Sequence, residues 1–359
     1  MACTDRLSRI DRPVADTVPM PAVRIEDLRR CLAGAFGALG LDDEGADDLA
    51  GLLVDSELRG HRDHGVAALG LLIRLYQDGA LNPRPSVRVL HETDGALLID
   101  GDRGCGPGAP MRAMEWCIER ARERKGMAVA AVRHWQLLVA APYVRLAAEA
   151  GLVGYACANY NALVAPPGGR TPVFGTNPLA YGLPADNHPP VVFDIATTVV
   201  AMQKVRVAAE EGTPMPEGLI FDSLGLPTTD ADAFFQGGTL APLGSPHAPH
   251  KGFGLALFVD ALSGVLTGAD TAPGNFLWAL DPEAFMPREQ FTARMDALVD
   301  RIKGGERSPG VEELVVPGER GARRHEELSR TGVVPVEQAG WQILTAGCDQ
   351  LGVPLPAVV

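Results

Sequence analysis

The sequence contains no long apolar run and no leader pattern. No stretch approaches the roughly 20 apolar residues that a membrane-spanning helix needs, and the first residues lack a basic segment followed by an apolar one. We therefore expect a protein that contacts no membrane and stays in the cytoplasm.

Positive charge is also scarce. The chain holds 32 Lys and Arg against 45 Asp and Glu, for a formal net charge of -13. Binding to nucleic-acid phosphates needs clustered Lys and Arg, so the composition excludes nucleic acid as a partner. An acidic balance of this size serves mainly solubility.

Closely paired cysteines are absent. The chain has six cysteines and no C-x-x-C pair, the spacing typical of metal and redox sites. Most of them lie in apolar segments, so we expect reduced, buried thiols. They are Cys3, Cys31, Cys105, Cys117, Cys157 and Cys348.

Two common catalytic motifs are missing as well. No G-x-S-x-G nucleophile elbow occurs, which argues against a serine hydrolase. The four glycines between Gly101 and Gly108 follow a predicted strand and precede a predicted helix, but their spacing is not G-x-G-x-x-G. No acidic residue closes a second strand about 20 positions later. A nicotinamide cofactor, if one is used, therefore binds outside a Rossmann fold.

What is present is a globular chain in which helix and strand patterns alternate without internal repeats. Its 359 residues and 46% hydrophobic content suffice for two domains with cores. Hydrophobic periodicity and turn residues predict strands at 86–90, 96–100, 127–132, 152–157 and 190–195, and helices at 25–39, 43–58, 66–77, 111–125, 142–150, 199–211, 252–266, 288–302 and 335–351. The helix over 252–266 is apolar apart from Asp260 and Ser263, which predicts burial. A proline-rich loop is expected ahead of it.

The run from Arg59 to Val66 places two histidines at the junction of two predicted helices. His64 follows Asp63 at a turn, where functional side chains concentrate. His61 and His64 are three residues apart, a spacing that suits zinc, but no cysteine lies nearby and the later pair at 247 and 250 flanks prolines. We therefore expect no metal. A histidine at a helix start is also commonly a capped or packed residue, so this run alone does not establish a site.

Five motifs follow one another in a recognisable order. They are Asp63–Val66, Gly175–Ala180, Val192–Thr198, Pro242–Gly244 followed by His250–Ala256, and Pro317–Arg320. With them the chain resembles the type 2 malate/L-lactate dehydrogenase family, to which sulfolactate dehydrogenase, ureidoglycolate dehydrogenase, diketogulonate reductase and Δ1-piperideine-2-carboxylate reductase belong. The resemblance extends from about Leu28 to Val353.

The resemblance implies an oxidoreductase that reduces a ketone or a cyclic imine with NADH or NADPH. It implies that His64 is the proton donor and that Asp63 and Asp194 orient its ring. A histidine suits this task because its pKa near 6.5 lets it reload from water. The cofactor contacts implied by the resemblance are Thr176, Asn177, Val192, Phe193, Ile195, Ala196, Thr197, Thr198, His250, Lys251, Gly318, Glu319 and Arg320.

The resemblance also implies an α/β fold with a mixed sheet that is not a Rossmann fold. We expect a flexible arm over 1–24, a helical and dimerisation domain from 25–110 with 325–359, and a cofactor-binding domain over 111–324. The N- and C-terminal helices should pack together. A homodimer is expected, with the active site between subunits. The helices at 25–39 and 66–77 are candidates for its contact, although each could equally be core.

Two of these residues have plain structural interpretations too. Asp194 closes an apolar strand, so a buried carboxylate there needs a partner, and it could cap the helix that follows Thr197. Lys251 could be a solvated loop lysine, although glycines at 252 and 254 allow close backbone approach. Both interpretations stay open at the level of the sequence.

One departure from the family pattern lies next to the histidine. Asp63 stands where the family usually has serine. Either residue could cap the helix that begins at Gly65, which would make the exchange structurally silent. If Asp63 instead contacts His64, its negative charge would raise the pKa of the imidazole.

Two further departures remove polar groups. Ala68 replaces an arginine, and Leu137 replaces a histidine within the run Gln136–Val139. They predict a wider and more apolar pocket near His64, unless Arg62 or Arg74 supplies the missing charge. We expect poor use of lactate, malate and pyruvate, and a bulkier ketone or imine of specialised metabolism instead. A cofactor-retaining paralogue with non-redox chemistry and a non-catalytic binding protein remain alternatives.

Overall fold

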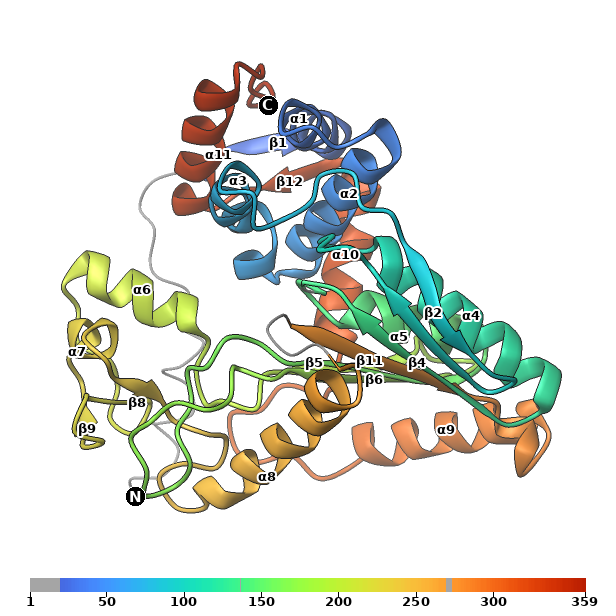
Figure 1. Cartoon of the computed structure of the whole chain (residues 1–359). Coiled ribbons are helices and arrows are strands. Elements are labelled where there is room, and N and C mark those ends of the chain that lie inside the picture. The colour runs from blue at the N-terminus through green and yellow to red at the C-terminus, as the bar shows by residue number, and fades with distance from the viewer. Residues whose placement is uncertain (1–19, 136, 269–272) are drawn as a thin grey trace.

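The computed structural model describes residues 20–135, 137–268 and 273–359 (Figure 1). It has a helical unit at the top of the view, a twisted sheet with its helices below, and a small lobe on the left. The mixed α/β class predicted from the sequence is confirmed. No helix in the described ranges combines the length and apolar character needed to cross a membrane.

The helical unit joins the two ends of the described chain. Strand β1 pairs antiparallel with β12, and Cys31 lies 3.3 Å from Cys348, sulfur to sulfur, between α1 and α11. The expected packing of N-terminal on C-terminal helices is therefore confirmed. Residues 22–24, expected in the arm, form β1 and bury Val23 completely; the rest of the arm, before residue 20, lies outside the described residues. The elements are β1 (Ala22–Arg24), α1 (Ile25–Ala38), α2 (Asp43–Arg59), α3 (Leu69–Gln77), α10 (Glu319–Thr331), β12 (Val333–Pro335) and α11 (Gln338–Leu351).

The main sheet has seven strands in the order β2-β3-β4-β11-β5-β6-β7. Only β3 and β4 run parallel, and the other neighbours are antiparallel. This order is not a doubly wound parallel sheet, so the expected non-Rossmann topology is confirmed. The strands are β2 (Arg88–Glu92), β3 (Ala96–Asp100), β4 (Met127–Arg133), β5 (Val153–Ala158), β6 (Leu179–Leu183), β7 (Val191–Ile195) and β11 (Gly274–Leu280).

Helices pack on both faces of this sheet. Because side chains alternate along a strand, Ala130 and Leu277 pack with α4 (Gly108–Arg124) and α5 (Ala141–Glu149) on one face. Their neighbours Ala131 and Phe276 pack with Val259 of α8 (Pro249–Asp260) on the other. Helix α9 (Arg288–Lys303) covers the end of the sheet formed by β6 and β7.

The small lobe was predicted as one helix followed by a proline-rich loop. It contains α6 (Met202–Glu211), α7 (Ala231–Phe235) and a three-stranded sheet in the order β10-β8-β9 around its own apolar core. Each of these strands has only two residues, too few to show an alternating pattern in the sequence. The strands are β8 (Ile220–Phe221), β9 (Pro227–Thr228) and β10 (Thr239–Leu240).

Helix α8 is only half buried, which corrects the prediction of a buried helix. It begins at Pro249 and continues as a π-helical turn over Ala261–Val265. Gly252, Ala256 and Val259 are buried, with Gly252 against Leu243 and Val259 against the sheet, whereas Leu257 and Phe258 are 53% and 56% exposed. The apolar composition of α8 therefore reflects two apolar faces of this helix. One face packs within the chain, and the other is exposed.

Candidate functional site

A cleft of about 990 Å³ separates the helical unit from the last strand of the sheet. Its walls come from the end of α2, the start of α5, strand β7, and the segment that leads into α10. Residues that are far apart in the sequence, from Arg59 to His325, therefore line one cleft. The side chains that matter below are His61, Arg59, Arg145, Asp194, Phe193 and Arg320.

His61 directly precedes the 3₁₀ turn Arg62–His64, which follows the end of α2 and ends at His64. The amide of His64 donates to the carbonyl of His61 at 3.0 Å, and residues three apart in a 3₁₀ turn lie on one face. His61 lines the cleft. Burial in the cleft lowers the pKa of His61. The charge of Asp194 acts to raise this pKa, and the charge of His64 lowers it further.

A buried carboxylate, which the sequence did not reveal, fixes this turn. Glu57 is 2% exposed and its Oε2 accepts from the amide of Val66 at 3.1 Å. A Cβ on Gly65 would lie 2.2 Å from that oxygen, so only glycine fits. Burial raises the pKa of Glu57, and the Val66 amide and two nearby arginines only partly offset this increase. The predicted cap by Asp63 is wrong, because no side chain caps the helix at Gly65 and Glu57 binds its first amide.

Asp194 lies near the end of β7 and binds the start of α5. Its Oδ2 accepts from the amides of Ala140 and Ala141, each at 2.8 Å. The carboxylate therefore caps α5, and not the helix after Thr197 that the sequence suggested. Burial raises the pKa of Asp194, while the two amides and the nearby His64 and His61 lower it. Asp194 thus senses the charge of both histidines.

Two arginines of the cleft share one carboxylate. Asp55 of α2 pairs with Arg59 at 3.0 Å and with Arg145 of α5 at 2.7 Å. Burial alone would raise the pKa of Asp55, but Arg145 and Arg59 outweigh it and the pKa is lowered. His325 of α10 approaches the same carboxylate at 3.5 Å. This group could not be recognised in the sequence, because its members lie on three helices that are far apart along the chain.

The segment before α10 brings a free cation to the cleft. Gly318 has φ +83°, and a Cβ there would lie 2.6 Å from the carbonyl oxygen of Val192. Glu319 is bound to Lys303 and Arg323. Arg320 is exposed on the cleft and has no ion pair within the described ranges. A helix N-terminus with an adjacent arginine can bind phosphate.

Three predicted cofactor residues have their side chains engaged within the protein, and a fourth is engaged through its backbone. Asn177 is fully buried and donates to the Ala256 carbonyl at 3.1 Å and to Asp260 at 3.0 Å. The Thr197 hydroxyl donates to the Thr176 carbonyl at 3.0 Å. The Thr198 hydroxyl donates to the Val200 carbonyl at 2.8 Å. Thr176 accepts through its backbone. These residues fix β7 against α8.

The remaining predicted cofactor residues divide between the cleft and its surroundings. Val192 and Phe193 line the cleft. Ile195 and Ala196 continue the strand, half buried. His250 and Lys251 are exposed in the first turn of α8 and do not line this cleft.

The two departures from the family pattern lie in apolar cores. Ala68 is 8% exposed in the core of the helical unit, and Leu137 is 3% exposed in the core under α4 and α5. Neither lines the cleft. The prediction that they widen a pocket near His64 is therefore wrong. Of the two arginines that might have supplied charge, Arg62 is paired with Glu337, and Arg74 is exposed in the last turn of α3.

The described part of the chain brings together no group of three His, Cys, Asp or Glu side chains that could hold a metal ion. The chemistry of the cleft therefore depends on His61, the Asp194 carboxylate and three arginines, with His64 in the adjoining turn and outside the cleft lining. Such a set can transfer a proton and hold anionic groups.

Comparison with known proteins places these features in one family. The family model described as malate/L-lactate dehydrogenase matches residues 23–345. Malate dehydrogenase of Pyrococcus abyssi is 35% identical over 311 residues, which cover 82% of this chain and 85% of that protein. The Δ1-pyrroline-2-carboxylate/Δ1-piperideine-2-carboxylate reductase of Pseudomonas putida is 32% identical over 336 residues, covering 88% of this chain and 94% of that one.

A solved structure agrees with the sequence matches. Malate dehydrogenase of Pyrococcus horikoshii superposes with a TM-score of 0.84 and 30% identity, covering 96% of this chain and 99% of that chain. The likeness therefore includes the helical unit, the seven-stranded sheet and the lobe between them.

Proposed function

This chain belongs to the malate/L-lactate dehydrogenase family of nicotinamide-dependent oxidoreductases, and we propose that it reduces a ketone or a cyclic imine that carries a carboxylate. The observation that carries this proposal is that His61 and Asp194 line one cleft with three arginines, and that His64 lies in the adjoining turn. A proton donor and an anion site are the two protein groups that such a reduction needs.

The cleft residues fit a nicotinamide dinucleotide. A volume of about 990 Å³ lies at the upper end of small-molecule sites, roughly 300–1,000 Å³. Arg320 and the start of α10 suit the pyrophosphate of NADH or NADPH, and Val192 and Phe193 offer apolar surface. When bound, the reduced nicotinamide supplies the hydride. We assign the remaining cofactor contacts to the backbone from Ile195 to Thr198 and to Lys251 on α8.

The proton comes from His64 in this proposal. The imidazole sits in a turn that Glu57 and Gly65 fix, and a fixed donor gains from orientation. The charge of His64 acts on the Asp194 carboxylate, and we propose that this carboxylate orients the ring for donation. Asp63 follows His61 in the same turn and adds negative charge nearby.

The substrate carboxylate is proposed to bind near Arg59 and Arg145. Both side chains are mostly buried, at 16% and 15% exposure, where a charged hydrogen bond is stronger than in water. Because Ala68 and Leu137 are core residues, the reason for expecting a bulky apolar substrate no longer holds. The two relatives compared above carry malate and cyclic imine carboxylates in their names.

Two assays test this function in sequence. Fluorescence titration with NADH and NADPH first measures cofactor binding. Loss of reduced-nicotinamide absorbance is then followed with pyruvate, oxaloacetate and Δ1-piperideine-2-carboxylate, with Δ1-piperideine as the matched substrate that lacks the carboxylate. We expect kcat/KM at least tenfold higher with one carboxylate substrate than with Δ1-piperideine. Cofactor binding without turnover of any of them would contradict a reductase.

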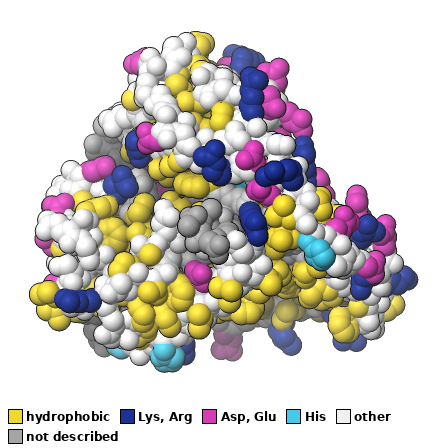
Figure 2. All heavy atoms as spheres, in the orientation of Figure 1, with side chains coloured by type: hydrophobic (Ala, Val, Ile, Leu, Met, Phe, Trp, Pro, Cys, Tyr) yellow, Lys and Arg dark blue, Asp and Glu magenta, His cyan; other side chains and the backbone are white. Residues whose placement is uncertain are grey.

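The exposed face of α8 supports the expected homodimer, which we propose with this face as its contact. Figure 2 shows hydrophobic side chains gathered over the lower part of the molecule, where α8 lies in Figure 1. An apolar patch of this kind marks an interaction site. The helices at 25–38 and 69–77 are less suitable, because their apolar residues pack in the core of the helical unit. The patch residues are Leu255, Leu257, Phe258, Val265 and Leu266, at 39–77% exposure.

A further inference from the structure

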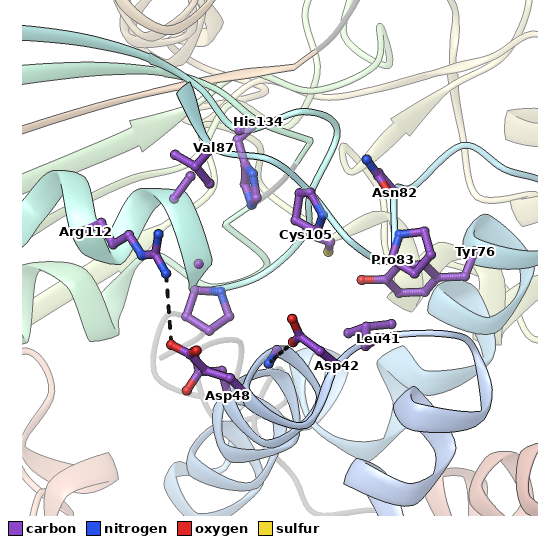
Figure 3. Close-up of a pocket in the computed structure, with 18 residues that line it drawn as sticks. Leu41, Asp42, Asp48, Tyr76, Asn82, Pro83, Val87, Cys105, Arg112 and His134 are labelled. Atoms are coloured by element: carbon purple, nitrogen blue, oxygen red, sulfur yellow. Dashed lines mark hydrogen bonds and ion pairs between the residues drawn. The ribbon is translucent and has the colours of Figure 1, made fainter. Parts of the chain in front are cut away.

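A second cavity lies at the start of α2, whereas the cleft lies at the end of this helix, and the two share no lining residue (Figure 3). Its volume is about 140 Å³. The walls are the start of α2, the proline-containing segment before β2, and the glycine turn that leads from β3 into α4. This turn is the glycine cluster whose spacing did not fit a dinucleotide motif, so the proposed function leaves it unused.

One buried side chain in this cavity lacks a partner. His134 is 3% exposed, and its Nε2 lies 3.1 Å from the Gly106 carbonyl. A carbonyl only accepts, so Nε2 carries the proton and Nδ1 is an acceptor. Nδ1 has no hydrogen-bond partner in the described part of the chain. Burial lowers the pKa of His134 to about 4, although the Gly106 and Gly101 backbone groups act to raise it. The ring is therefore neutral at neutral pH.

The glycine turn is shaped around this imidazole. A Cβ on Gly101 would lie 2.7 Å from Nδ1, and one on Gly104 would lie 3.0 Å from Cε1. In Figure 3 the His134 ring extends toward Cys105 and the space between the labelled side chains. A buried acceptor without a donor is costly. A ligand that brings an N–H group would remove that cost.

The charged residues around the cavity are mostly acidic. Asp42, Glu44 and Asp48 line it, and Arg112 is the one cation among its lining residues. Arg112 lies 4.0 Å from Glu44, and Asp42 accepts from the Gly45 amide at 2.9 Å. Burial raises the pKa of Asp48, and Glu44 and Asp47 add to the effect, so these carboxylates crowd one another. The site therefore favours a cation.

We propose that this cavity binds a small organic ammonium ion whose N–H group donates to His134 Nδ1 and whose charge faces Asp48. A metal ion is disfavoured, because the described residues contain no group of three ligating side chains. The volume matches a ligand of about six ring atoms, since an engineered cavity of about 150 Å³ holds benzene. The apolar walls that would contact the ring are Pro83, Pro85, Val87 and Pro107.

Isothermal titration calorimetry with piperidine tests the site. At neutral pH piperidine is a six-membered ring with a cationic NH₂ group, and tetrahydropyran is the neutral ring of the same size without a donor. We expect saturable binding of piperidine and at least tenfold weaker binding of tetrahydropyran. Absence of piperidine binding, equal binding of the two rings, or preferential binding of inorganic phosphate would overturn the proposal.

Three variants locate the binding. Asp48→Asn should weaken piperidine binding about tenfold or more, whereas Asp47→Asn, the same change one residue away and outside the cavity, should not. Gly108→Met should obstruct the cavity, because Gly108 lines it and a Cβ there meets no atom within 4 Å, so the new side chain has room to extend into it. Unchanged affinity in both Asp48→Asn and Gly108→Met, or competition between piperidine and NADH, would place the binding elsewhere.

Discussion

The position of His64 depends on the contact between Glu57 and Gly65. The Glu57 carboxylate is buried and binds the amide of Val66, and Gly65 leaves room for it. Motif recognition pointed to Asp63–Val66 but not to Glu57, because a residue nine positions earlier on a helix looks like any other acidic residue. The structure supplies the reason for a glycine directly after the histidine.

Gly65→Ala should therefore displace the turn that carries His64. A Cβ would lie 2.2 Å from Glu57 Oε2, and overpacking of this kind costs roughly 1–3 kcal/mol. We expect lower thermal stability and a reduced kcat with little change in cofactor affinity. The double variant Gly65→Ala/Glu57→Ala should lose less stability than the sum of the single variants. Additive losses measured by urea unfolding would show that this clash is not the cause.

His134 should make stability depend on pH. Its pKa is about 4 in the folded protein against an ordinary 6.5, so between these values the unfolded chain binds a proton that the native state does not. Stability is therefore fully present above pH 6.5 and falls as the pH drops toward 4, by up to roughly 3 kcal/mol. In urea unfolding, the free energies of unfolding of the wild type and of His134→Gln should therefore approach each other or cross as the pH falls from 6.5 to 4. Parallel curves would mean that His134 does not titrate there.

At the scale of elements, the sequence predicted most helices of the two main units within a few residues but omitted α10 and the strands β1, β6, β11 and β12. Helix α10 has no buried residue, so it lacks the apolar periodicity by which helices are recognised. Strand β6 has only five residues. The omission of α10 mattered for the site, because α10 brings Arg320 and His325 to the cleft.

Arg320→Ala should weaken cofactor binding, because a charged hydrogen bond to phosphate is lost. We expect about a tenfold increase in the Kd of NADH or NADPH by fluorescence titration. Arg323→Ala is the matched control on the same helix, since Arg323 is engaged with Glu313 and Glu319. An equal effect of both substitutions would point to a general change in α10 and remove Arg320 from the phosphate site.

At the scale of the whole molecule, composition alone could not show which apolar surfaces are buried. The segment 252–266 was predicted to be buried because it is apolar, yet Val265 is 77% exposed in the single chain. A second copy that covers this face would satisfy both observations. The departures at Ala68 and Leu137 were misjudged for a related reason, since a change of polarity does not reveal whether a residue faces a cleft or a core.

Phe258→Glu should therefore convert a dimer into a monomer, because a charge would be buried in an apolar contact. Sedimentation velocity at micromolar concentration should show a dimer for the wild type and a monomer for the variant. Phe285→Glu is the matched control, because Phe285 is 78% exposed and lies outside α8. A wild-type monomer at that concentration would reject the homodimer.

The central claim is that His64 donates the proton of a nicotinamide-dependent reduction. The most direct measurement is the steady-state rate of His64→Ala beside that of His61→Ala, with cofactor affinity measured for both. General acid catalysis contributes roughly 10²–10⁴-fold, so His64→Ala should lose kcat in that range while its Kd for the cofactor stays within about twofold. His61→Ala should lose much less. Near wild-type turnover in His64→Ala, or the larger loss in His61→Ala, would contradict the assignment.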